Sequence, residues 1–158
     1  MKNQKGFSLI ELLVVVIIIA IIAAIAIPSL LASRRAANQS STVQNLRTVV
    51  SANATMASLN QGNYGASFAV ISGGTNNYLD DSWTGTPTKN GYLFTYTPSA
   101  NVNPIVGYCV TAAASSASAG DFSYAVSHQG VIYQLAGTTA PACDSATGVI
   151  STGTVVGS

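Results

Sequence analysis

The chain has 158 residues, a formal net charge of +1 and only 7% charged residues, against about 25% in ordinary soluble domains. This composition excludes the strongly basic surface by which proteins bind nucleic acid, and the length allows one small soluble domain beside an N-terminal apolar segment. A weakly charged exterior suits a subunit packed among identical copies, because net charge keeps molecules apart.

The chain opens with a short basic leader followed by a long apolar run. Lys2 and Lys5 are the only charges of the leader, and residues 12–27 contain no polar side chain. The run reaches the roughly 20 residues that span a bilayer, and it is longer than the roughly 7–15-residue core of a cleaved secretory signal. We therefore expect a membrane-spanning helix whose basic leader stays in the cytoplasm.

Glu11 is the one acidic residue near the start of this run. A carboxylate at the centre of a membrane helix costs about 2.5–3.5 kcal/mol on insertion scales, so it needs either a partner or a place near the headgroups. Five residues beyond Gly6 it can reach the cytoplasmic interface, as it would in a simple signal anchor. The residues alone leave both interpretations open.

The order Gly6, Phe7 and Glu11, placed between a basic leader and an uninterrupted apolar stretch, resembles the processing motif of type IV prepilins and of the related type II secretion pseudopilins. The resemblance implies that prepilin peptidase cuts between Gly6 and Phe7 and N-methylates Phe7. It also implies that Glu11 pairs with the new ammonium group of Phe7 during assembly. Pro28 is the point near which the helix of the family can melt, and a static kink is the alternative.

Residues 29–59 contain neither glycine nor proline, and they continue the helix. One apolar face recurs at three- and four-residue steps, at Val43, Leu46, Val50, Ala54 and Ala57. The pattern predicts a single helix from about Phe7 to Leu59, with Gly62 as a left-handed cap. Pro28 lacks an amide hydrogen and crowds the carbonyl of Ala24, so a kink or local loosening is expected there.

An irregular connector and a set of alternating strands follow. The connector, the αβ-loop of the family, covers 60–91, where Gly, Pro, Asn and Asp are frequent. The strand patterns lie at 92–97, 108–112, 122–126 and 131–135, with a hairpin turn over 127–130, a loop over 113–120 and a tail from 138 held only by Cys143. The expected fold is α+β: a long N-terminal helix packed on an antiparallel sheet of about four strands.

Cys109 and Cys143 are the only cysteines, and both lie on the exported side of the predicted helix. An even count in an oxidising compartment predicts a disulfide, which for a loop of this size stabilises the fold by roughly 3–4 kcal/mol. With one histidine and no Cys-x-x-Cys spacing, zinc has no support.

The remaining polar residues do not form a catalytic arrangement. The acids all fall in predicted loops, and the one histidine lies in a turn expected to be exposed, so we expect no enzyme and no cofactor: the residues are Asp80, Asp81, Asp121, Asp144 and His128. Asp80 and Asp81 are a weak calcium candidate, with solvated loop charges favoured.

Arg34 and Arg35 could pair with a neighbouring subunit or with lipid phosphates, or remain solvated. The aromatic side chains of the connector are predicted to pack in the core: Tyr64, Phe68, Tyr78 and Trp83.

Together these patterns predict a leader over 1–6, a transmembrane or filament-core helix over 7–31 and a globular domain over 32–158. The domain would comprise helix to about 59, αβ-loop over 60–91, and sheet with disulfide region over 92–158. The resemblance implies a structural type IV pilus subunit, held in the inner membrane as a precursor and then assembled into an extracellular filament. The implied partners are identical subunits, prepilin peptidase, the inner-membrane assembly machinery and, before assembly, membrane lipid. The alternatives are a type II secretion pseudopilin and a membrane-anchored binding module.

Overall fold

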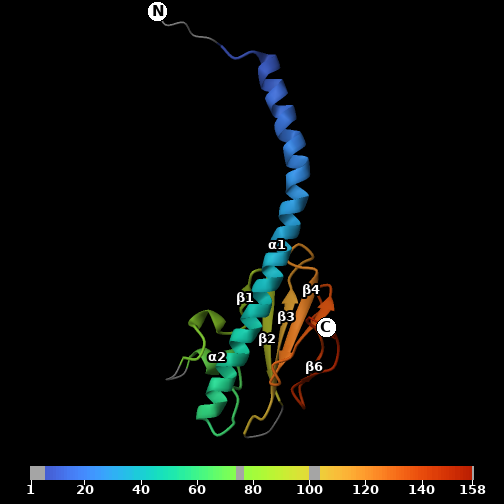
Figure 1. Cartoon of the computed structure of the whole chain (residues 1–158). Coiled ribbons are helices and arrows are strands. Elements are labelled where there is room, and N and C mark those ends of the chain that lie inside the picture. The colour runs from blue at the N-terminus through green and yellow to red at the C-terminus, as the bar shows by residue number, and fades with distance from the viewer. Residues whose placement is uncertain (1–5, 74–76, 100–103, 158) are drawn as a thin grey trace, which may run out of the picture. The chain divides into compact units, whose positions relative to one another are not determined.

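The computed structural model describes residues 6–73, 77–99 and 104–157. Its contacts divide the chain into two compact units, Met1–Arg34 and Arg35–Ser158. One helix, α1 (Leu9–Leu59), contributes to both (Figure 1). The helix begins two residues later than predicted, at Leu9. The preceding residue, Ser8, accepts a hydrogen bond at its carbonyl from the amide of Leu12, at 3.2 Å. Ser8 therefore has the place of an N-cap, which serine favours.

The first unit is a single apolar helical segment. The large apolar side chains from Phe7 to Leu31 are all exposed, by 85% at Phe7 and 39% at Leu31. The segment is long and apolar enough to cross a membrane. The chain remains α-helical on both sides of Pro28, so the missing hydrogen bond does not end the helix.

The second unit contains a six-stranded antiparallel sheet. Its order is β1 (Thr88–Lys89), β2 (Tyr92–Pro98), β3 (Tyr108–Ala114), β4 (Phe122–Ser127), β5 (Ile132–Ala136) and β8 (Thr154–Val155). The four long strands are those predicted, with ends within two residues. The additional strands β1 and β8 are two residues each, too short to give an alternation pattern.

Two regions are more ordered than the sequence indicated. The connector contains α2 (Phe68–Ser72) and the 3-10 turn η1 (Asp81–Trp83). The tail forms a hairpin of β6 (Cys143–Asp144) and β7 (Val149–Ile150), and then pairs with β5 through β8. The prediction that Cys143 alone holds the tail was therefore wrong, because backbone hydrogen bonds hold it too.

The core lies between α1 and one face of the sheet. Leu46, Val49 and Ala57 of α1 are buried there, while the predicted Ala54 is exposed. The buried face is turned slightly from the one that the apolar pattern predicted, and the pattern did not reveal this because two of the buried residues, Thr42 and Asn53, are polar. The aromatic prediction is confirmed: Phe68 and Trp83 are buried, and Tyr64 and Tyr78 pack partly buried against them.

The opposite face of the sheet carries a second, smaller cluster. Cys109 and Ala125 alternate with the residues that face α1, and they pack with Ile150 of the terminal hairpin. The predicted disulfide is present: Cys109 and Cys143 are bonded, with their Cα atoms 6.3 Å apart. It attaches the terminal hairpin to the face of the sheet that α1 leaves free.

Candidate assembly and processing site

The residues of the predicted processing site lie together at the start of the helix. Gly6 and Phe7 precede α1 and are exposed, and a Cβ built on Gly6 would meet no atom within 4 Å. The peptide bond between them is therefore sterically open to a protease. An exposed segment outside regular secondary structure is the kind of substrate that a protease can bind in extended form.

Glu11 lies in the first turn of α1, and its side chain is exposed. The first turn of a helix carries unpaired amide hydrogens and the positive end of the helix dipole, so a carboxylate is favoured there by a few tenths to about 1 kcal/mol. This gives the acid a local role within one subunit. Because the side chain of Glu11 is exposed, its carboxylate can still pair with a cation from outside the helix.

The apolar surface beyond Glu11 has no covering within its own unit. From Leu12 to Leu31 every large side chain is at least 39% exposed. At roughly 25 cal/mol per Å² of apolar surface, leaving such a helix in water would be strongly unfavourable. The segment therefore needs lipid, or the equivalent segments of other copies, as its surroundings.

The comparisons with known proteins agree with this geometry. Residues 1–27 match the prokaryotic N-terminal methylation motif. The N-terminal segment therefore has the methylation motif that the sequence led us to expect. Over 38 residues it is also 50% identical to the type IV wide pilus major component PilA4 of Thermus thermophilus, a stretch that covers 24% of this chain and 29% of that protein. No solved structure is significantly similar to the chain.

Among the described residues, no group of three His, Cys, Asp or Glu side chains is placed to hold a metal ion. Asp80, the weak calcium candidate, instead caps η1: its Oδ1 accepts a hydrogen bond from the amide of Ser82 at 2.9 Å. The hydrogen bonds from Ser82, with a contribution from Lys89, lower the pKa of the Asp80 carboxyl.

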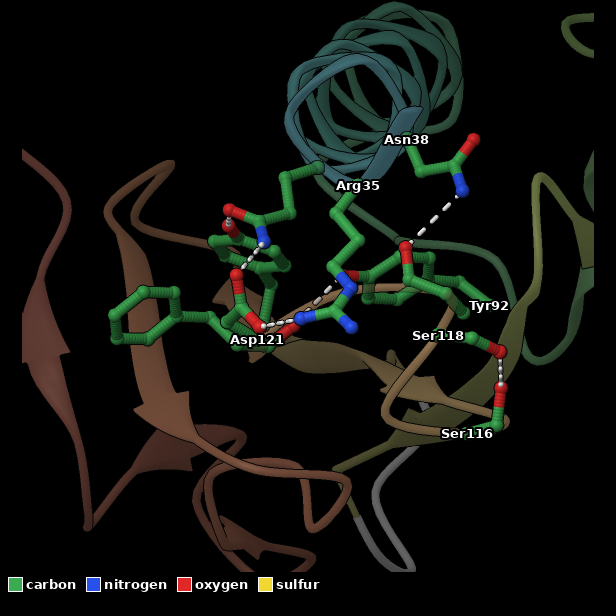
Figure 2. Close-up of polar contacts among 10 residues, drawn as sticks. Arg35, Asn38, Tyr92, Ser116, Ser118 and Asp121 are labelled. Atoms are coloured by element: carbon green, nitrogen blue, oxygen red, sulfur yellow. Dashed lines mark hydrogen bonds and ion pairs between the residues drawn. The ribbon is translucent and has the colours of Figure 1, made fainter. Parts of the chain in front are cut away.

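The neighbouring residues Arg34 and Arg35 differ in their surroundings. Arg34 is exposed, whereas Arg35 forms a salt bridge of 3.0 Å with Asp121, the residue before β4 (Figure 2). We had predicted that Arg35 is either solvated or paired with a neighbouring subunit or lipid phosphate, and this contact within the chain is neither. The sequence could not reveal it, because the two residues are 86 positions apart.

The prediction that His128 is exposed was wrong. It lies in the predicted turn after β4 but is half-buried, since the ring of Tyr64 packs near it with the ring centroids 6.2 Å apart. The predicted hairpin itself is confirmed, with Gly130 at a φ of 78°. The serines of the loop after β3 are exposed, and the hydroxyls of Ser116 and Ser118 are 2.8 Å apart (Figure 2).

Sequence reasoning missed Asn53, which links α1 to the connector. Its side chain is fully buried; Nδ2 donates to the carbonyl of Val49 at 3.2 Å, and Oδ1 accepts from the amide of Gly65 at 3.3 Å. The Tyr96 hydroxyl lies 3.0 Å from the same Oδ1 and 2.7 Å from the carbonyl oxygen of Gly65. One signal was available: Asn53 falls four residues from both Val49 and Ala57, on the apolar side of the helix.

Proposed function

We propose that the chain is a structural subunit of a type IV pilus, assembled into a helical surface filament from a membrane-bound precursor. The observation that carries the proposal is the stem, defined as residues 7–31: an exposed apolar segment, helical from Leu9, that overlaps the methylation motif of residues 1–27. The similarity of 38 residues to a major pilus component of Thermus supports a filament-forming role.

The first steps are insertion and processing. The stem enters the inner membrane with the leader on the cytoplasmic side. Prepilin peptidase then cuts between Gly6 and Phe7 and methylates the new amino group. The exposure of both residues and the open space around Gly6 support cleavage at this bond.

The next step is docking of the processed stem against stems already in the fibre. The carboxylate of Glu11 pairs with the ammonium group of Phe7 on a neighbouring or the same subunit, which exists only after the leader is removed. Because stranding one partner of a buried ion pair costs about 3–5 kcal/mol, docking in the wrong register is penalised. Burial of the Leu, Ile and Val side chains among the stems supplies most of the cohesion.

The partners are then identical subunits, prepilin peptidase and the inner-membrane assembly machinery whose motor extrudes the fibre. Lipid surrounds the stem before assembly. The precursor resides in the inner membrane, and the assembled protein is extracellular.

Mass spectrometry of the N-terminus, on fibres sheared from the cell surface, tests the proposal. We expect the first residue to be N-methylated Phe7. Surface fibres whose subunits still begin at Met1 would contradict it. A processed chain that is found only in the periplasm would favour the second candidate, a type II secretion pseudopilin, because the methylation motif is common to both groups.

A further inference from the structure

The Arg35–Asp121 pair is the one salt bridge among the described residues, and it lies at the first residue of the second unit. The residues of α1 that precede it, from Ala24 to Arg34, are all exposed. Arg35 is thus the first residue of α1 in the second unit, and its side chain already contacts the loop before β4. The side chain of Arg35 is 31% exposed and that of Asp121 is 57% exposed, so the pair is accessible to ions.

Two further side chains of α1 hold the same loop, residues 115–121. Asn38 donates from Nδ2 to the carbonyl of Ala119 at 3.0 Å, and Gln39 makes a longer contact of 3.5 Å from Nε2 to Oδ2 of Asp121 (Figure 2). Positions 35, 38 and 39 are three and four residues apart, so they lie on one side of the helix. All three side chains therefore hold a single loop.

The loop is itself fixed to the sheet. The hydroxyl of Tyr92 donates to the carbonyl of Phe122 at 2.7 Å, and it occupies the space that a side chain at Gly120 would need. The next turn of α1 after these contacts enters the core, where Thr42 and Leu46 are fully buried. A helix released from the loop would next have to uncover those two residues.

We propose that Arg35, Asn38 and Gln39, together with Asp121 and Ala119, form a clamp that stops unwinding of α1 from entering the globular unit. A helix opens most readily where its hydrogen bonds are exposed and incomplete, and both conditions hold around Pro28. Opening that spreads toward the C-terminus meets its first tertiary contacts at the clamp. The clamp divides α1 into a part that can open alone and a part that opens only with the sheet.

In a filament, which is the function proposed above, the clamp sets how much of each subunit can extend under load. Helix before residue 35 can lengthen while the globular unit stays intact. In a subunit without the clamp, opening would reach the buried residues Thr42 and Leu46 more often. High salt should also weaken the clamp, because it screens the partly exposed ion pair between Arg35 and Asp121.

Hydrogen exchange on the full chain in detergent micelles tests the clamp without requiring a filament. We expect Arg35→Gln and Asp121→Asn to speed exchange of the amides of residues 36–42 by about two- to five-fold, the range for one exposed ion pair. The matched controls Arg34→Gln and Asp81→Asn make the same charge changes outside the clamp and should leave these amides unchanged. Added salt should speed the same amides in the parent chain but not in Asp121→Asn.

The charge-exchanged double variant, Arg35→Asp with Asp121→Arg, should recover protection relative to either single change. Equal exchange rates of the amides of residues 36–42 in Arg35→Gln and Arg34→Gln would overturn the proposal. So would protection that the charge-exchanged variant fails to restore. Absence of surface filaments alongside the expected exchange pattern would count against the proposed function and leave the clamp supported.

Discussion

At the scale of single residues, the proposed function depends on Gly6, Phe7 and Glu11. All three are exposed, so changes in them can affect processing without affecting folding of the globular unit. Gly6 has no neighbour that a side chain would strike, and Glu11 is exposed in a first helical turn. Substitutions at either position should therefore leave the globular unit intact. Any defect they cause can be assigned to the leader or to assembly.

Gly6→Val should leave the leader attached and abolish fibres. A branched side chain at the cut keeps the peptide away from the protease backbone, which glycine allows to approach closely. Immunoblotting would show the longer precursor in the membrane fraction, with no protein in sheared surface material. Because nothing in the fold opposes a side chain at Gly6, normal circular dichroism is the control, and normal fibres from this variant would contradict the cleavage step.

Glu11→Val should be processed and inserted into the membrane yet enter fibres at least about tenfold less well. The loss follows from the cost of about 3–5 kcal/mol for leaving the Phe7 ammonium group unpaired in the fibre core. Electron microscopy and immunoblots of sheared material measure it. Glu11→Gln keeps the shape and removes the charge, so it should show the same defect; wild-type recruitment of Glu11→Gln would rule out charge pairing.

At the scale of elements, the parts with a strong periodic signal were predictable from the sequence. The long helix and the strands β2 to β5 follow from spacing alone. Long-range polar contacts do not, because Arg35 and Asp121 meet only after the sheet has formed. The strands β1 and β8, two residues each, are likewise set by their neighbours and not by their own sequence.

The Cys109–Cys143 disulfide attaches the terminal hairpin β6–β7 to the sheet, together with the packing of Ile150 on Cys109 and Ala125. The double change Cys109→Ala with Cys143→Ala should lower the free energy of unfolding by roughly 3–4 kcal/mol. Denaturant titration in detergent measures the loss, and hydrogen exchange should show it concentrated in residues 143–150. Reduction of the parent chain should reproduce the result; unchanged stability in both cases would show that the backbone hydrogen bonds of the tail are sufficient.

At the scale of the whole molecule, stability should fall in alkali. Burial raises the pKa of Tyr92 to about 12 from an ordinary value of about 10, and it also raises the pKa values of Tyr96 and Tyr108. These phenols ionise more easily in the unfolded chain. The stability that depends on keeping them neutral is complete below pH about 10 and is lost as the pH rises toward about 12.

Thermal unfolding and tyrosinate absorbance, followed together across this range, check the prediction. The midpoint temperature should hold up to pH about 9 and fall above pH about 10, with absorbance rising as the fold is lost. Full ionisation of the tyrosines near pH 10 without unfolding would mean that the aromatic core is open to solvent.

The sheet has one further consequence. Each of its margins is a strand only two residues long, and an edge strand this short offers few amide and carbonyl groups of its own for pairing with another chain. Globular units held at the density of a fibre surface would thus have little opportunity to fuse through their backbones into amyloid-like stacks. In the proposed filament, cohesion between subunits would then come from the apolar stems and not from pairing of the sheets.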